Sequence, residues 1–427
     1  MQRIDTFRQR LSSRKNDLGF CFLTVFLWGF LAHGYAFLNT FLSHDLLNAF
    51  SATQTEELWK LELGRLFVPV YRFIFRNPVY LPWVIGILGL SWIALSLFFL
   101  LEAFEIRSKT LLVFIAGMMT TNITVIAQIA TYAYEFDANA FSLLCAILSV
   151  FFWHRSKGFL SVAASSLCLF ISTGVYQAFI AVTAVLMLFR LILDLLNGET
   201  LRTVLLRGLK GLLILSLGLL LYFAGSRAVA ALWGIKLQDR IRLVADGGLF
   251  TLLQQIPPAM NFLIAGILHP AYQSKVFPLA VFITALLLSA SVLRLFIVKK
   301  FRADRILLLF LLVGLCPLGM TCVYFAARGI AMHDLTKYAV WLFYIFLLFF
   351  AFRLCKKDML PGFLPRICRA AACLLIGVML WQNVLLANTA YVKKEREADA
   401  ALSAMTRVVS MIETGKTIRR AKPGWLS

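Results

Sequence analysis

Charged residues are scarce in this chain. Asp, Glu, Lys and Arg make up 15% of its 427 residues and hydrophobic residues make up 61%, whereas soluble domains average about 25% and about 45–50%. The deficit leaves long apolar blocks that a water-soluble fold does not tolerate. It excludes a disordered, collagen-like or disulfide-stapled secreted chain and predicts an all-α polytopic membrane protein.

Cysteine and histidine spacings typical of metal sites or disulfide frameworks are also absent from the sequence. The eight cysteines include no CxxC pair and no Cys/His cluster, so the sequence indicates neither a zinc site nor a disulfide framework. The basic N-terminus resembles the start of a signal peptide. The apolar run that follows, residues 18–42, is too long for one and has no small-residue cleavage site. We therefore expect it to be a retained first span.

Apolar segments near the length needed to cross a membrane, about 20 residues, recur along the chain. We predict eleven spans, and their odd number places the two termini on opposite sides. We divide the chain into a transmembrane domain (1–390) and an extracytoplasmic tail (391–427). The spans are residues 18–42, 80–101, 111–130, 138–153, 159–174, 175–196, 208–224, 277–298, 306–326, 338–352 and 370–387.

The net charge of +21 would fit nucleic-acid binding, but its distribution favours another cause. Cytoplasmic loops of membrane proteins collect Lys and Arg. With the N-terminus in the cytoplasm, the inner segments hold 23 Lys and Arg against 8 Asp and Glu, a net +15. The outer segments hold 19 against 13, a net +6. This asymmetry predicts a cytoplasmic N-terminus and an outer C-terminus. It also predicts that the basic residues interact with membrane lipids and that the chain does not bind nucleic acid.

The first outer segment, residues 43–79, carries a helical pattern. Its apolar residues recur at helical spacing opposite a row of basic ones, which predicts an amphipathic helix lying on the membrane surface. The apolar set is Leu63, Leu66, Phe67, Val70, Phe73 and Ile74, and the basic set is Lys60, Arg65, Arg72 and Arg76.

Charge is nearly absent from the centres of the predicted spans, where transporters usually carry ionisable residues. Polar residues gather at the outer ends of the spans, which favours an enzyme whose site opens at the outer interface. A flippase or transporter of lipid-linked glycans is the alternative, and it predicts pseudo-symmetric halves with polar groups through the midplane. A membrane acyltransferase would need a catalytic His or Arg on the inner side, where the loops offer only His154.

Two outer motifs near the first span supply candidate residues. Asp45, preceded by His44, lies directly after that span and could accept a proton from an acceptor hydroxyl. Position alone favours the alternative interpretation, a helix cap or a solvated loop acid. Arg65 could hold a phosphate through paired donors, or it could extend to lipid headgroups.

Glu135 and Asp137 lie in a short outer loop without a neighbouring base. They could bind a metal, sugar hydroxyls or a basic partner, or form an ordinary negative turn. Two carboxylates do not make a metal site, so no metal ligand is assigned, and a divalent cation stays an open alternative. Tyr176 and Gln177 could bind sugar hydroxyls and offer a ring for stacking, or belong to the interfacial aromatic belt.

Arg328, His333 and Lys337 lie in the outer loop after the ninth predicted span. The two bases could neutralise a phosphate, and His333 could serve as a second acid or base, although a lone histidine is weak evidence. His33 lies alone in the first span, and we interpret it as a buried histidine with satisfied hydrogen bonds.

In their order and spacing, these motifs resemble the bacterial membrane glucosyltransferases of the GtrII type, the O-antigen glucosyltransferases of serotype conversion. The resemblance covers most of the chain. It rests on Ser43-His44-Asp45-Leu46, Gly64-Arg65, Thr121-Asn122-Ile123-Thr124, Thr131-Tyr132 with Glu135 and Asp137, Gly174 with Tyr176-Gln177-Ala178, and Asn388, Tyr391, Lys393-Lys394, Thr406-Arg407 and Ile412-Glu413 in the tail.

The resemblance implies a GT-C-like architecture in a bacterial inner (plasma) membrane, with the site at the outer face under interfacial helices. It implies a polyprenyl-phosphate donor, glucose as the sugar and a surface polysaccharide as the acceptor. In GT-C enzymes an acid of the first outer loop acts at the reacting centre, and Asp45 matches that position. The expected reaction is one inverting displacement, with Arg65, Arg328 or Lys337 facing the leaving phosphate. No Rossmann or P-loop signature occurs, and no cofactor is implied with certainty.

Overall fold

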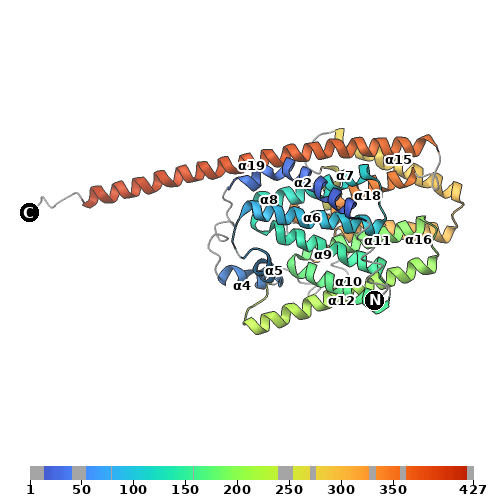
Figure 1. The fold of residues 1–427 in the computed structure, drawn as a ribbon, viewed down its shortest axis with the longest axis horizontal. Helices are drawn as coiled ribbons and strands as arrows, with labels where there is room; N and C mark the ends of the chain where they lie inside the picture. The colour runs from blue at the N-terminus through green and yellow to red at the C-terminus, as the bar shows by residue number, and fades with distance from the viewer. Residues whose placement is uncertain are drawn as a thin grey trace, which may run out of the picture.

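The computed structural model describes residues 14–40, 54–77, 79–156, 158–238, 253–269, 276–326, 333–355 and 362–420. Within these ranges all regular elements are helices (Figure 1). The prediction of an all-α polytopic membrane protein is therefore confirmed.

Nine helical segments of the described chain are long and apolar enough to cross a membrane. Two shorter apolar helices, α14 (Ile256–Leu268) and α18 (Tyr338–Leu354), accompany them. The nine are α2 (Lys15–Leu38), α6 (Pro82–Phe104), Lys109–Arg155, α10 (Gly158–Val175), Gln177–Leu196 with α11 (Ile180–Leu196), α12 (Leu201–Trp233), α15 (Val276–Lys299), α16 (Ala303–Met320) and α19 (Phe363–Arg420).

Each of the eleven predicted spans overlaps a helix of the described chain. The difference between eleven and nine has two causes. The α18 helix has only 17 residues, and the segment Lys109–Arg155 holds two predicted spans. Because Arg155 lies 3.6 Å from Glu105, just after α6 ends, the chain must travel out and return within this segment. Its elements are α7 (Lys109–Thr121), α8 (Ile123–Tyr132), the 3₁₀ turn η1 (Ala133–Glu135) and α9 (Phe136–Arg155).

Short polar side chains set several helix starts. Ser108 accepts a hydrogen bond from the Leu111 amide at 3.3 Å, and Thr200 accepts one from the Thr203 amide at 3.2 Å. Asn122 accepts from the Val125 amide at 3.2 Å, while its amide nitrogen donates to the last carbonyls of α7. Asn122 therefore ends α7 and starts α8, because its side chain satisfies backbone groups on both sides of the break.

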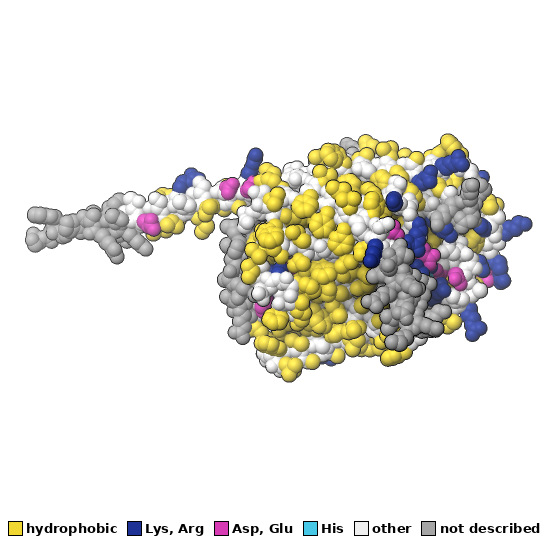
Figure 2. Space-filling view, in the orientation of Figure 1, with side chains coloured by type: hydrophobic (Ala, Val, Ile, Leu, Met, Phe, Trp, Pro, Cys, Tyr) yellow, Lys and Arg dark blue, Asp and Glu magenta, His cyan; other side chains and the backbone are white. Residues whose placement is uncertain are grey.

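The bundle has two ends, which differ in charge. We call the end where α2 begins the proximal end; there Arg14 pairs with Glu102 near the end of α6. Lys and Arg side chains gather at this end, on the right of Figure 2. The opposite, distal end carries η1 and the two short helices α4 (Gln54–Glu62) and α5 (Val68–Phe75) (Figure 1).

The prediction of a single amphipathic helix in the first outer segment is wrong, because this segment forms two separate helices, α4 and α5. The chain turns between them at Gly64, whose φ of +73° lies in the left-handed region that favours glycine. A Cβ there would collide with the Tyr222 hydroxyl. The predicted apolar face persists on α5, where Phe73 and Ile74 are 78% and 63% exposed. Buried Tyr71 anchors the other side of α5, accepting a hydrogen bond from the Trp92 indole at 2.9 Å.

His33 in α2 has satisfied hydrogen bonds, as predicted. Its Nε2 lies 2.9 Å from the Thr120 carbonyl oxygen, and its Nδ1 lies 2.7 Å from the Tyr391 hydroxyl. The ring therefore donates from Nε2 to the carbonyl and accepts at Nδ1 from the tyrosine. This buried chain of hydrogen bonds joins α2, α7 and α19.

The last predicted span and the tail form one element. The α19 helix runs from Phe363 to Arg420 and leaves the body of the molecule at the distal end (Figure 1). The helix predicted for the tail up to Glu413 is confirmed, and it is continuous with the span that precedes it.

Candidate active site

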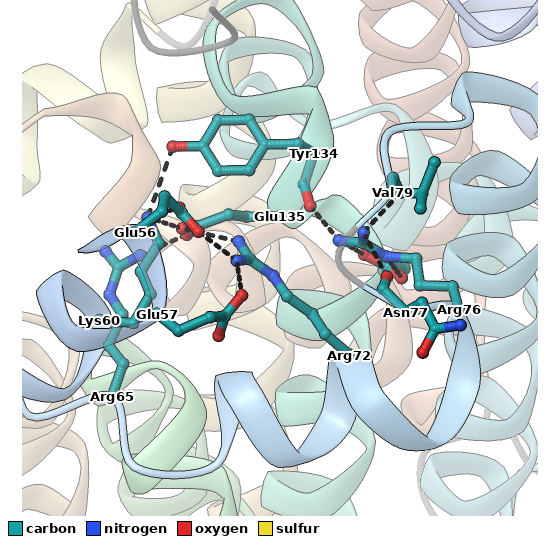
Figure 3. A network of polar contacts seen from close by, with 11 residues as sticks. Glu56, Glu57, Lys60, Arg65, Arg72, Arg76, Asn77, Val79, Tyr134 and Glu135 are labelled. Carbon is teal, nitrogen blue, oxygen red and sulfur yellow. Dashed lines mark hydrogen bonds and ion pairs between the residues drawn. The ribbon is translucent and has the colours of Figure 1, made fainter. Parts of the chain in front are cut away.

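A buried polar network lies at the distal end, where α4, α5 and η1 meet (Figure 3). Its centre is Glu135, the last residue of η1, with a side chain only 4% exposed. The Lys60 ammonium lies 2.5 Å from Glu135 Oε1, Arg65 pairs with Oε2, and the Arg72 guanidinium lies 3.8 Å from Oε1. One carboxylate therefore binds three cations of the first outer segment.

The network is balanced by two more acids. Arg72 Nη1 contacts Glu56 at 2.6 Å and Glu57 at 2.8 Å. Glu56 also pairs with Lys60 at 3.1 Å, one helical turn along α4. Burial alone would lower the pKa of Arg72, but the carboxylates of Glu135, Glu56 and Glu57 outweigh it and raise that pKa above its ordinary value. Three acids and three bases together carry no net charge, which makes their burial tolerable.

Asp137 belongs to a neighbouring buried pair. Its carboxylate is fully buried and lies 2.7 Å from Arg76 Nε. Arg76 also donates to the carbonyl oxygens of Tyr134 and of Val79, the latter at 2.9 Å (Figure 3). Arg76 therefore fixes the end of α5 against η1. In the sequence no base lies near Glu135 and Asp137. In the structure their basic partners come from α4, from α5 and its end, and from the turn between the two helices.

Arg65 is the most accessible base of the network. Its side chain is 20% exposed, against 4% for Lys60 and 3% for Arg72. Its guanidinium lies 5.2 Å above the centre of the Tyr176 ring, a cation–π contact. Burial lowers the pKa of Arg65, but Glu135 and the two tyrosines Tyr176 and Tyr134 raise it overall. Arg65 thus stays charged and can meet an anion arriving at the distal end.

Tyr176 and Gln177 hold the turn that carries Arg65. Gln177, in the 3₁₀ turn η2 (Gln177–Phe179), donates to the Leu63 carbonyl at 2.8 Å and to the Tyr222 hydroxyl at 3.0 Å. Burial raises the pKa of Tyr176 to about 12, so its hydroxyl keeps its proton and donates to the Leu335 carbonyl at 3.3 Å. The structure brings Arg65, Glu135, Tyr176 and Gln177 into one site.

His333 and Lys337 flank a short 3₁₀ turn that lies beside Tyr176. The turn η3 (Asp334–Thr336) contains Leu335, whose carbonyl accepts from Tyr176. Lys337 contacts Asp334 at 2.7 Å and lies 4.9 Å above the Phe262 ring, whereas His333 is exposed. Three further candidates, His44, Asp45 and Arg328, lie outside the described residues.

Sequence reasoning missed Lys60 and Arg72 as partners of Glu135, because both belong to the predicted basic face of a surface helix. The acids Glu56 and Glu57 one turn before Lys60 were the available signal. In the described part of the chain, no group of three or more His, Cys, Asp or Glu side chains could hold a metal ion. The acids of the network are occupied by Lys and Arg.

Comparison with known proteins gives one match. The family model described as Glucosyl transferase GtrII matches residues 34–354, about three quarters of the chain. The matched range includes the whole polar network and ends before α19. No curated protein and no solved structure matches the chain.

Proposed function

Because the chain belongs to the GtrII glucosyl transferase family, we propose that it transfers glucose from a polyprenyl-phosphate donor to a surface polysaccharide. Membership of this family supports the general activity, which is the transfer of glucose to a glycan. The proposal adds the lipid-linked donor, the polysaccharide acceptor and the outer face of a bacterial inner membrane as the place of reaction.

The observation that supports this function is Arg65 above the Tyr176 ring. A guanidinium held by a buried carboxylate on one side and open on the other can bind a phosphate through its remaining donors. The neighbouring tyrosine and Gln177 supply a ring and an amide suited to a sugar. The exposed apolar face of α5 lies beside this position, where the lipid part of a donor would have to remain in the membrane.

The reaction is a single displacement. Asp45, with His44 beside it, takes the proton from an acceptor hydroxyl, and the freed oxygen attacks the anomeric carbon of the donor. The bond from that carbon to the phosphate oxygen breaks as the new bond forms, and the phosphate leaves with the electron pair. The configuration inverts, and the sugar passes through oxocarbenium-like character.

The leaving phosphate gains charge as its bond breaks, so nearby cations stabilise the transition state more than the bound donor. We assign this role to Arg65, together with Arg328 and Lys337. Glu135 positions Arg65, and Asp137 positions Arg76 at the end of α5. Asp45 belongs to the segment joining α2 to α4, and the described ends of that segment both lie at the distal end.

The orientation follows from charge. The proximal end carries Arg14, Arg155, Arg302 and Arg353 in or next to its short loops, which is typical of a cytoplasmic side. The distal end then faces outward, and α19 carries the C-terminus to that side. This is the side on which a surface polysaccharide is accessible.

The test uses membranes containing the protein, radiolabelled polyprenyl-phosphate glucose and the acceptor polysaccharide. Label is expected in the polymer, and Asp45→Asn is expected to abolish its transfer at normal protein level. Asp17→Asn, at the proximal end, is the matched control and should transfer normally. Transfer by Asp45→Asn would refute Asp45 as the base. Label that crosses the membrane on intact lipid without reaching polymer would support a flippase instead.

A further inference from the structure

A second group of basic side chains lies at the proximal end, where α9, α11 and α12 pack together. His154 and Arg155 end α9, Arg190 lies in α11, and Arg207 and Lys210 lie in α12. The charges of the four Lys and Arg side chains all act on the His154 ring. Three helices therefore bring four bases to one imidazole, and we call these five residues the proximal basic cluster.

Of the acids that pair with this cluster in the described chain, only Asp194 is buried. Its side chain is 2% exposed and lies 3.1 Å from Arg190 and 2.6 Å from Arg207. Glu105 and Glu199 are 52% and 42% exposed and lie 3.6 Å and 3.8 Å from their basic partners. Water screens such exposed pairs. Because two of the three acids are screened in this way, the four bases keep an excess of positive charge.

Some buried nitrogen atoms of the cluster have no hydrogen-bond partner within the described chain. Arg190 is 5% exposed and donates to the Ala103 carbonyl at 3.0 Å, but its Nε is unpaired. The Nε of Arg155 and the Nδ1 of His154 are also buried and unpaired. Since buried donors in proteins nearly always have an acceptor, the two unpaired guanidinium N–H groups indicate an acceptor from outside the chain.

Lys210 adds a charge that is held by neutral groups. Its ammonium donates to the Trp153 carbonyl at 3.0 Å and to the Ser161 hydroxyl at 2.7 Å. These acceptors lie near the end of α9 and the start of α10, so the ammonium lies at the level where the two helices reach the membrane surface. An ammonium has three donors, and the third can bind an anion at that level.

Outward-facing apolar side chains border the cluster. Leu206 and Leu213 share a face of α12 with Lys210 and are 56% and 50% exposed. Phe159 and Leu160, at the start of the neighbouring α10, are 87% and 71% exposed. In a membrane these side chains face acyl chains. An anion on the cluster would therefore lie at the depth of the lipid headgroups, directly beside hydrocarbon, which fits a lipid better than a free ion.

We propose that the proximal basic cluster binds the phosphate group of an anionic membrane phospholipid, whose acyl chains lie along α10 and α12. Basic pockets between membrane helices bind anionic headgroups in this way. Arg155 and Arg207 are 29% and 33% exposed, and their planar guanidinium groups suit phosphate oxygens. The site lies at the opposite end of the molecule from Arg65, and the proposal does not depend on glucosyl transfer.

Thermal unfolding of the full chain in a neutral detergent, measured against added lipid, tests the proposal. Dioleoyl phosphatidylglycerol has a net negative charge, and dioleoyl phosphatidylcholine has the same chains without net charge. We expect the first lipid to raise Tm in a saturable way, because a ligand of the folded state stabilises it, and the second to have little effect. Equal effects of the two lipids would overturn the proposal. Equal stabilisation by inorganic phosphate would overturn it too, since the site would then take a free anion.

Variants of Lys210 locate the site. Lys210→Gln removes the charge, and we expect it to raise the half-saturating concentration of phosphatidylglycerol about tenfold, the effect of one lost charged hydrogen bond. Lys210→Arg keeps the charge and should stay within about twofold of the unmodified chain. The control is Arg302→Gln, which removes an 82% exposed charge at the same end and should also stay within about twofold, because water and salt screen such a charge.

Each titration is compared with the lipid-free Tm of the same variant, so a variant that is less stable still reports its own lipid binding. The same half-saturating concentration for Lys210→Gln and for the unmodified chain would overturn the assignment of the lipid to this cluster. An equal rise for Arg302→Gln would do so as well, because the lipid would then respond to the overall charge of the proximal end.

Discussion

Replacing Glu135 by glutamine removes one charge from the centre of the polar network while keeping the shape of the side chain. Breaking a buried ion pair from one side usually costs about 3–5 kcal/mol, because the partner charge is left uncompensated. Here Lys60 keeps Glu56 at 3.1 Å, and Arg72 keeps Glu56 and Glu57. Arg65 is 20% exposed and can be hydrated. We therefore expect the lower end of that range, about 3 kcal/mol.

The assay is thermal unfolding of the purified protein in detergent. For a protein of this size about 3 kcal/mol corresponds to a fall in Tm of about 3 °C. The control is Asp334→Asn, since the ion pair of Asp334 with Lys337 is 47% exposed on the acid side. Exposed pairs contribute about 1 kcal/mol at most, so this variant should change Tm by less than about 2 °C.

A double-mutant cycle makes the reasoning refutable. If Lys60 and Glu135 interact as their 2.5 Å separation indicates, the variant with Lys60→Met and Glu135→Gln should lose less stability than the sum of the two single variants. The expected difference is about 1–3 kcal/mol. Strict additivity, or an unchanged Tm for Glu135→Gln alone, would show that the network does not stabilise the fold.

Two further predictions concern the turn that carries Arg65. Gly64→Ala should lower Tm more than Gly198→Ala. Both positions have positive φ, but only at Gly64 would the new Cβ collide with the Tyr222 hydroxyl. Adding Tyr222→Phe to Gly64→Ala should recover part of the lost Tm, and equal losses for the two glycine variants would contradict the packing argument. Arg65→Lys keeps the charge but loses the planar fork, so we expect about a tenfold rise in the KM for the polyprenyl-phosphate donor, equivalent to about 1.4 kcal/mol, with Tm nearly unchanged. Lys60→Arg is its control, and an unchanged KM for Arg65→Lys would remove Arg65 from the donor site.

Much of the fold follows from the sequence, because the thickness of the bilayer sets the length and the apolar character of each membrane-spanning segment. A span needs about 20 apolar residues and a helical backbone, so the position and the type of the main elements could be read along the chain. The satisfied His33 and the helical tail were predicted for similar local reasons. The split of the first outer segment at Gly64 was not predicted, because the apolar spacing continues through this residue. Its left-handed backbone and the Tyr222 hydroxyl that a Cβ would meet become visible only in the structure.

The sequence by itself determined an all-α membrane protein with polar residues collected at one end and a family resemblance carried by short motifs. It could not say whether Glu135 and Asp137 face a ligand or the chain itself. Their partners Arg65 and Arg76 are 70 and 61 residues away, and no local pattern specifies pairing over such distances. Only the tertiary structure brings α4, α5 and η1 together. It turns the basic residues inward because buried carboxylates need opposite charge, and it leaves Arg65 as the most exposed of the three bases that pair with Glu135.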